Sequence, residues 1–153
     1  MRVKFVIPGE PKGKGRPRVE RHGDRTVTRT PDDTIIYENL VRTEYLRQCG
    51  GHRFAGDEQL DLRVIAYYPI PSSKSKKQQR LMEAGMIRPT KKPDTDNVLK
   101  VIADSLNQVA YKDDAQVVDT MVRKFYSRIP RTVVLISEAV PRGPFDGGGG
   151  AGE

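Results

Sequence analysis

The sequence predicts a small single domain of the α/β (α+β) class, in which helices pack against a mixed β-sheet. Its 153 residues give room for one ordinary domain with one hydrophobic core. Segments with strand and helix periodicity follow one another in the order strand, loop, helix, strand, helix, helix, strand, strand, without internal repeats. We therefore expect the domain to span residues 1–140 and the Gly-rich tail 141–153 to be disordered.

The first half of the chain predicts a strand, a basic loop and a helix. Residues 1–7 alternate polar and apolar side chains, which is typical of a half-buried strand. The following stretch, GEPKGKGRPRVE at residues 9–20, is expected to be a loop because Gly and Pro prevent a regular element. Residues 31–48 begin with aspartates and carry apolar side chains at helical spacing, so they predict a core-packing helix.

The second half predicts the remaining helices and strands. Residues 59–70 alternate apolar side chains on one face and end in prolines, as a strand does. Residues 73–85 predict a short basic helix closed by a glycine. A helix follows over about residues 97–108, because apolar side chains recur there at helical spacing. Residues 119–126 and 132–137 are expected to form a strand pair joined across the turn RIPR.

Composition excludes several classes of protein. A charged fraction of 31% with 36% hydrophobic residues is typical of a soluble globular protein, and the N-terminus does not resemble a signal peptide. No apolar run approaches the roughly 20 residues of a membrane span. Cys49 is alone, and His22 and His52 lack partners at zinc spacing, so neither a disulfide nor a zinc site is expected. We expect a cytoplasmic protein without a membrane partner or a small-molecule cofactor.

Charge is distributed unevenly within a net charge of +7. Residues 1–31 carry nine basic and three acidic side chains, and residues 72–92 carry seven and one. Residues 93–119 invert the balance, with two basic and six acidic side chains. A basic surface around a compact acidic cluster favours a protein that holds a polyanion and places a divalent metal against it. The alternative is ordinary solvated surface charge.

The two basic segments supply candidate DNA contacts. In the loop at residues 9–20 the cations recur at every second position, so an extended chain would point them to one side, toward phosphates. A mobile basic loop without a specific ligand is the alternative. The basic helix is expected to direct its charges toward solvent or DNA. The candidate DNA-binding residues are Lys12, Lys14, Arg16, Arg18, Lys74, Lys76 and Lys77.

The acidic stretch KKPDTDNVLKVIADSLNQVAYKDDAQVVD, residues 91–119, contains candidate metal ligands. An extended PDTD segment would place Asp94 and Asp96 on the same side of the backbone, where both carboxylates can share one cation. Asp96 is expected at the N-cap of the following helix. Hard oxygen ligands suit Mg²⁺ or Mn²⁺.

A lysine and three more acids follow Asp96, on the predicted helix and shortly after it. The helical face opposite the apolar one carries Lys100, Asp104 and Asn107, and a lysine there would neutralise charge on a phosphoryl group. A second acidic pair, Asp113 and Asp114, precedes the next strand. Taken separately, each acid fits a cap or a turn equally well.

In combination, KPDTDNVLKVIADSL followed by DDAQV resembles the signature of the RusA family of Holliday junction resolvases, bacterial and phage endonucleases that cut four-way DNA junctions. The resemblance is closest over residues 92–118 and extends loosely to the N-terminal strand and basic loop. It implies a compact, RusA-like mixed fold and a homodimer that requires Mg²⁺, with Mn²⁺ as a substitute. The implied catalytic residues are the metal ligands Asp94, Asp96 and Asp114, together with Lys100.

The resemblance therefore predicts a structure-selective DNA endonuclease that resolves four-way junctions by paired, symmetric nicks in recombination and repair. Two alternatives remain: a metal-dependent nuclease for other branched nucleic acids, and a non-catalytic DNA-binding protein. Asp94 and Asp96 precede the predicted helix and Asp114 follows it, so one chain needs an early helix end to bring them together. We favour a site in which the partner subunit supplies Asp114.

Overall fold

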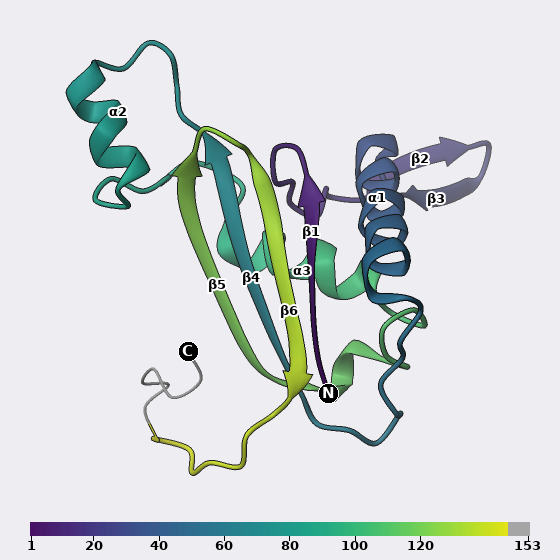
Figure 1. Ribbon diagram of the computed structural model, residues 1–153. Helices are drawn as coiled ribbons and strands as arrows, with labels where there is room; N and C mark the ends of the chain where they lie inside the picture. Colours follow the sequence, from purple (N-terminus) through teal and green to yellow (C-terminus); the bar gives the residue numbers. More distant parts are fainter. Residues whose placement is uncertain (147–153) are drawn as a thin grey trace.

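A four-stranded sheet in the order β1–β6–β4–β5 forms the centre of the computed structural model, which describes residues 1–146 (Figure 1). Its strands are β1 (Arg2–Pro8), β4 (Leu60–Pro69), β5 (Val117–Ser127) and β6 (Arg131–Glu138). β6 pairs antiparallel with both β1 and β4, whereas β5 pairs parallel with β4. The sheet is therefore mixed, as the sequence predicts.

One predicted pairing is wrong. The strands on either side of the RIPR turn, β5 and β6, are not neighbours, because β4 lies between them. The connection passes over the end of β4, where Pro69 is level with Ser127 of β5. Nearly every residue of β4 is buried or half-buried, as expected for a strand that has partners on both sides.

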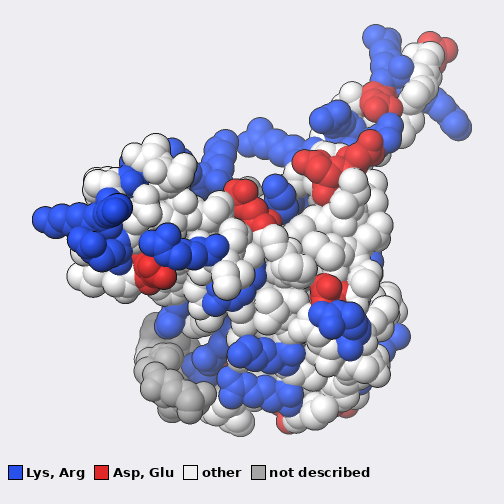
Figure 2. Space-filling view, turned by 45° about the horizontal axis from the view of Figure 1, so that its top comes forward, with Lys and Arg blue, Asp and Glu red and all other residues white. Residues whose placement is uncertain are grey.

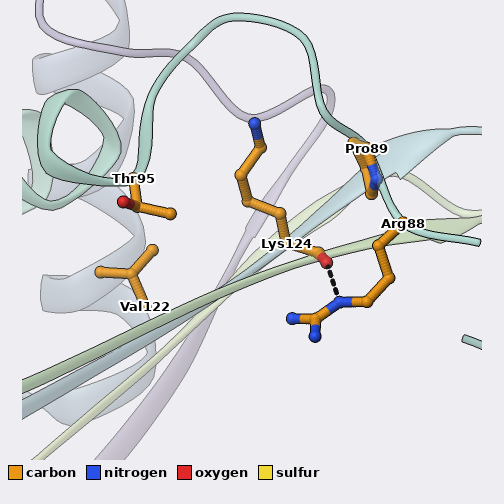
Figure 3. Close-up of a pocket in the computed structure, with 5 residues that line it drawn as sticks. All are labelled: Arg88, Pro89, Thr95, Val122 and Lys124. Carbon is orange, nitrogen blue, oxygen red and sulfur yellow. Dashed lines mark hydrogen bonds between the residues drawn. The ribbon is translucent and has the colours of Figure 1, made fainter.

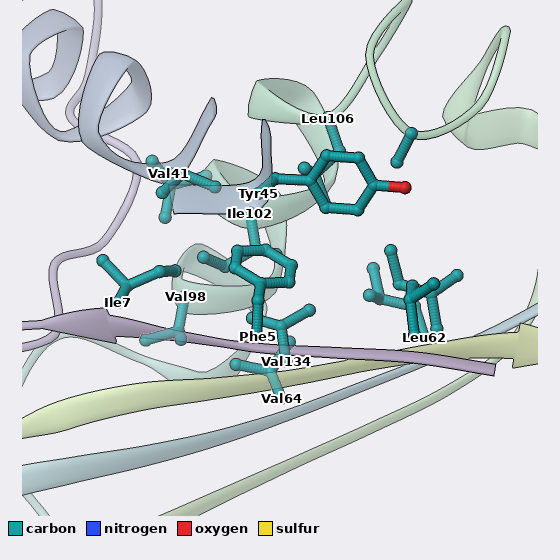
Figure 4. Packing of buried hydrophobic residues seen from close by; sticks show 14 of the residues in the cluster. Phe5, Ile7, Val41, Tyr45, Leu62, Val64, Val98, Ile102, Leu106 and Val134 are labelled. Atoms are coloured by element: carbon teal, nitrogen blue, oxygen red, sulfur yellow. The ribbon is translucent and has the colours of Figure 1, made fainter. Parts of the chain in front are cut away.

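Two helices cover one face of the sheet, α1 (Asp32–Cys49) and α3 (Thr95–Ser105) (Figure 1). The hydrophobic core lies between them and the strands, because alternate residues of each strand and one side of each helix point inward (Figure 4). Phe5 of β1 packs edge to face on Tyr45 of α1 with ring centroids 5.3 Å apart. The fully buried side chains include Phe5, Ile7, Val41, Tyr45, Leu62, Val64, Val98, Ile102, Leu106 and Ile136.

Two elements project from this core. The strands β2 (Arg18–His22) and β3 (Arg25–Arg29) form a separate antiparallel hairpin for which no strands were predicted. The prediction of a loop over residues 9–20 is therefore wrong at its end, because β2 begins directly after Pro17. The basic helix α2 (Lys76–Glu83) lies at the other side of the molecule, beyond the ends of β4 and β5 (Figure 1). A single 3₁₀ turn, η1 (Asp114–Gln116), precedes β5.

The predicted tail is described only in part. Asp146 accepts a hydrogen bond from the backbone of Gly143 at 2.6 Å, and residues 147–153 lie outside the described residues. Among the helices of residues 1–146, none is both long and apolar enough to cross a membrane.

Candidate active site

Helix α3 begins at Thr95, and Asp94 is its N-cap residue. The backbone of Asp94 is extended (φ −69°, ψ 158°), and its carbonyl accepts the first helical hydrogen bond from Val98 N at 3.0 Å. The prediction that Asp96 caps the helix is therefore wrong. An extended Asp94 after Pro93 satisfies the N-cap geometry two positions earlier, so Asp96 lies in the first helical turn. The prediction that an extended PDTD segment directs Asp94 and Asp96 to the same side is therefore also wrong, because the helix already begins at Thr95.

Both acids are exposed at this helix end. Asp94 makes no side-chain cap bond, and among residues 1–146 neither its carboxylate nor that of Asp96 forms an ion pair. The partial positive charge at a helix N-terminus stabilises carboxylates there without neutralising them. Two acceptor groups are thus available to a cation from solvent.

The other predicted acids lie at the opposite end of α3. Asn107 Oδ1 accepts a hydrogen bond from Asp114 N at 2.8 Å, which attaches the η1 turn to the end of the helix. The carboxyl group of Asp114 lies beside Asp104, and burial raises its pKa, with the neighbouring Asp113 and Asp104 adding to the effect. Asp104 and Asp114 therefore lie together at the end of α3 that is opposite to Asp94 and Asp96.

One chain does not bring the predicted metal ligands together. Asp96 and Asp104 are separated by eight residues, which is about 12 Å along a helix at ~1.5 Å per residue. Helix α3 does end early, at Ser105, but the returning loop brings Asp114 only to Asp104. Over residues 1–146, no group of three potential ligands lies close enough to hold a metal ion.

Lys100 and Lys14 meet at Asp104. Lys100 Nζ lies 3.6 Å from Asp104 Oδ2, which is the pairing expected for residues one turn apart. Lys14 Nζ lies 3.4 Å from the same oxygen and 3.1 Å from Glu38 Oε1 of α1. Lys12, Arg16 and Arg18 are exposed, whereas Lys14 points inward, so the four cations of the loop do not share one side.

Two shallow basic grooves flank the N-terminus of α3. One, of about 270 Å³, is lined by Arg88, Pro89, Thr95, Val122 and Lys124 (Figure 3). Its charges are held in place, since Arg88 Nε donates to the backbone oxygen of Lys124 at 2.9 Å and Lys124 Nζ donates to Lys91 O at 2.6 Å. Arg88 and Lys124 therefore place positive charge on this side of the helix end that carries Asp94 and Asp96.

The second groove, of about 390 Å³, lies between the basic loop and the same helix end. Its lining residues are Glu10, Pro11, Lys12, Gly13, Lys14, Arg16, Lys92, Pro93 and Asn97. Lys14 N donates to Asn97 O at 3.0 Å, so the loop is fixed to the first turn of α3. The sequence indicated a basic loop and an acidic segment separately, and the fold makes them neighbours.

The remaining predicted DNA contacts lie on a projecting lobe. Lys74, Lys76 and Lys77 are exposed at the start of α2, where Ser75 caps the helix by accepting from Gln78 N at 3.2 Å. Figure 2 shows basic side chains on this lobe and on the hairpin side of the molecule, with a small group of acidic side chains between them. Cations in a first helical turn oppose the helix dipole, and a bound phosphate would relieve that repulsion.

Basic grooves on both sides of an acidic helix end are typical of the class of proteins that act on nucleic acids. Residues 8–137 match the family described as "Endodeoxyribonuclease RusA". The uncharacterized protein YqaN from Bacillus subtilis (strain 168) is 38% identical over 136 residues, which cover 89% of this chain and 96% of the relative.

The chain therefore belongs to the RusA endodeoxyribonuclease family, as the signature in residues 92–118 predicts. It is an endodeoxyribonuclease of the Holliday junction resolvase class, and branched DNA is the substrate of this family.

The sequence did not lead us to predict the basic hairpin β2–β3. A signal was present, because the two-residue loop Gly23-Asp24 separates two short runs that contain β-branched residues, Val19 in the first and Thr26, Val27 and Thr28 in the second.

Proposed function

We propose that this protein resolves four-way DNA junctions by Mg²⁺-dependent hydrolysis of phosphodiester bonds, with paired, symmetric nicks. The observation that carries the proposal is the position of Asp94 and Asp96, exposed and without ion pairs among the described residues, between two cation-lined grooves. A DNA strand that follows the grooves would place a phosphate beside these carboxylates.

Asp94 and Asp96 suit a hard divalent cation, because their carboxylate oxygens have no competing ion pair within residues 1–146. Mg²⁺, with Mn²⁺ as a substitute, would supply Lewis-acid activation of the phosphate and of the attacking water. The protein's own contribution is to hold both carboxylates at the positive end of α3 and to orient the strand. Asp114 is the third proposed ligand.

Lys100 is proposed to stabilise the negative charge that develops on the phosphate. Its ammonium group lies against Asp104, one turn beyond Asp96, and its side chain is 63% exposed, so it can turn toward bound DNA.

The phosphate contacts are proposed to come from Lys12 and Arg16 of the loop, from Arg18 at the start of β2, and from the α2 lobe through Lys74, Lys76 and Lys77. All six are exposed. Lys14 differs, because its ammonium group already lies between Glu38 and Asp104. We propose that it fixes the loop in place for the others.

A homodimer is proposed to complete the site. Asp114 lies with Asp104, about 12 Å along α3 from Asp96, so a partner subunit that packs antiparallel to this helix would bring its own Asp114 toward Asp94 and Asp96. Two such sites related by a two-fold axis would cut two strands of a nearly two-fold junction symmetrically.

The test is cleavage of four end-labelled substrates by the purified protein with Mg²⁺: a four-way junction, a fork, a linear duplex and a single strand. We expect paired cuts in the junction and little cleavage of the duplex and single strand. Equal cleavage of fork and junction would instead identify a nuclease for branched nucleic acids in general. Binding without cleavage of any substrate would identify a DNA-binding protein that is not an enzyme.

A further inference from the structure

The hairpin β2–β3 contributes little to the stability of the domain. Its strands pair from Arg18 with Arg29 to His22 with Arg25, and only Glu20 among the strand residues is even partly buried. An isolated two-stranded hairpin without a buried face is only marginally stable in water. A hairpin of this kind is suited to contact a binding partner rather than to stabilise the domain.

The charge of the hairpin indicates the chemistry of that partner. Arg29 is neutralised, because its guanidinium group lies 2.8 Å from Asp32 Oδ1 and 3.7 Å from Glu20 Oε1. Arg18, Arg21 and Arg25 are exposed, and among residues 1–146 none of them forms an ion pair. Guanidinium groups without carboxylate partners are suited to bidentate contacts with phosphates.

The base of the hairpin is anchored beside the candidate active site. Gly15 N donates to Thr34 Oγ1 at 3.2 Å, and Lys14 N donates to Asn97 O, so the preceding loop is held by both α1 and α3. The hairpin then extends away from this anchor as a projecting arm (Figures 1 and 2). DNA bound in the groove that Lys12 and Arg16 line would extend toward the hairpin.

We infer that the hairpin Arg18–Arg29 binds in the major groove of a duplex arm of the DNA substrate, an inference that rests on the proposed function. Five strand residues extend about 17 Å at ~3.4 Å per residue. The major groove, about 12 Å wide and about 8.5 Å deep, admits a two-stranded ribbon. Arg21 and Arg25 contact phosphates at the groove walls, while the exposed Val19 and Thr28, which pair across the ribbon on the face of Arg21, are available to thymine methyl groups.

Two pairs of substitutions with the same loss of charge provide the test. Arg21→Ala with Arg25→Ala removes the arginines of the hairpin. The matched control, Arg2→Ala with Arg123→Ala, removes two exposed arginines from β1 and β5. The measurements are the salt dependence of binding to duplex and junction, the first-order cleavage rate at saturating protein, and interference from methylation of guanine N7, an atom of the major groove.

The hairpin variant is expected to bind roughly tenfold or more weakly at low salt, with a salt slope lower by about 1.8 for two lost phosphate contacts. The methylation interference is expected to disappear, and the cleavage rate at saturation to stay unchanged. The control is expected to match the wild type.

Equal slopes and affinities for the two variants would overturn the inference. A conversion of dimer to monomer in the hairpin variant, seen by sedimentation velocity, would also overturn it, because the hairpin would then be a subunit contact. A failure of the proposed function is distinguishable, because it would remove cleavage from the wild type without changing the binding contrast between the two variants.

Discussion

The ammonium group of Lys14 lies 3.4 Å from Oδ2 of Asp104, so the basic loop is joined to the helix that carries Asp94 and Asp96. Glu38 of α1 approaches the same ammonium group at 3.1 Å. The side chains of Lys14, Glu38 and Asp104 are only 20%, 12% and 23% exposed, so solvent screens these ion pairs weakly. Lys14 therefore acts as a connection between three segments that are far apart in the sequence.

Replacing Lys14 by alanine is expected to lower the cleavage rate at saturating protein at least tenfold, because the loop loses its connection to α3. The loss of charge-assisted contacts should also lower the free energy of unfolding by about 1–3 kcal/mol. Single-turnover cleavage and chemical denaturation measure the two effects.

Lys12→Ala is the matched control, since it removes the same charge from an exposed position of the same loop. It should lower the salt slope of DNA binding by about 0.9 and leave the unfolding free energy unchanged. If Lys14→Ala behaved in the same way as Lys12→Ala, Lys14 would be an ordinary phosphate contact.

Gly13 allows the loop to pack closely on α3. A Cβ atom at this position would lie 2.6 Å from Pro93 Cβ and 3.2 Å from Asn97 Cβ, and neither neighbour is the flexible end of a side chain. Gly13→Ala should therefore move the loop, with a loss of about 1–3 kcal/mol typical of overpacking. Cleavage should fall together with the melting temperature.

Gly56→Ala controls for the added methyl group, because its Cβ would meet only the flexible side chain of Lys112 at 3.3 Å. Thermal unfolding and junction cleavage of the two variants are compared side by side. Normal cleavage by Gly13→Ala would mean that the position of the loop does not matter for the chemistry.

Much of the fold is predictable from local patterns. The periodicity of Val98 and Ile102 identified α3, and the alternation in residues 1–7 identified β1. The end of α3 was placed too late because Val109 also fits the helical spacing. In the structure the chain has already turned, since Gln108 adopts a positive φ of 63°.

The relations between segments were harder to predict. A three-residue turn between two strands normally indicates a hairpin. Here β4 lies between β5 and β6 and pairs with both of them. The inward direction of Lys14 also depends on a contact with α1, 24 residues away. Such contacts are set by packing between distant segments, and alternation along the loop carries no information about them.

The origin of Asp114 in the proposed site can be tested with a mixed dimer of Asp96→Asn and Asp114→Asn subunits. If Asp114 of the partner subunit completes each site, one site of the mixed dimer loses both acids and the other is intact. The mixed dimer should then nick one strand of a junction. The measurement is nicking of a labelled junction after formation of the mixed dimer has been verified.

A site built within each chain predicts the opposite result, because both sites of the mixed dimer would then lack one acid. Homodimers of each single variant, mixed only after binding to separate junctions, serve as the control. Complete absence of nicking with intact junction binding would reject the shared site.

The most direct test of the central claim is cleavage of a labelled four-way junction in Mg²⁺ by the wild type and by Asp96→Asn, with binding measured in parallel. Asparagine keeps nearly the same size but removes the charge of a proposed ligand, so we expect cleavage to fall by orders of magnitude. Binding should be retained or become tighter, since a negative charge that faces phosphate is gone. Cleavage by Asp96→Asn at the wild-type rate would contradict the assignment of the active site to the N-terminus of α3.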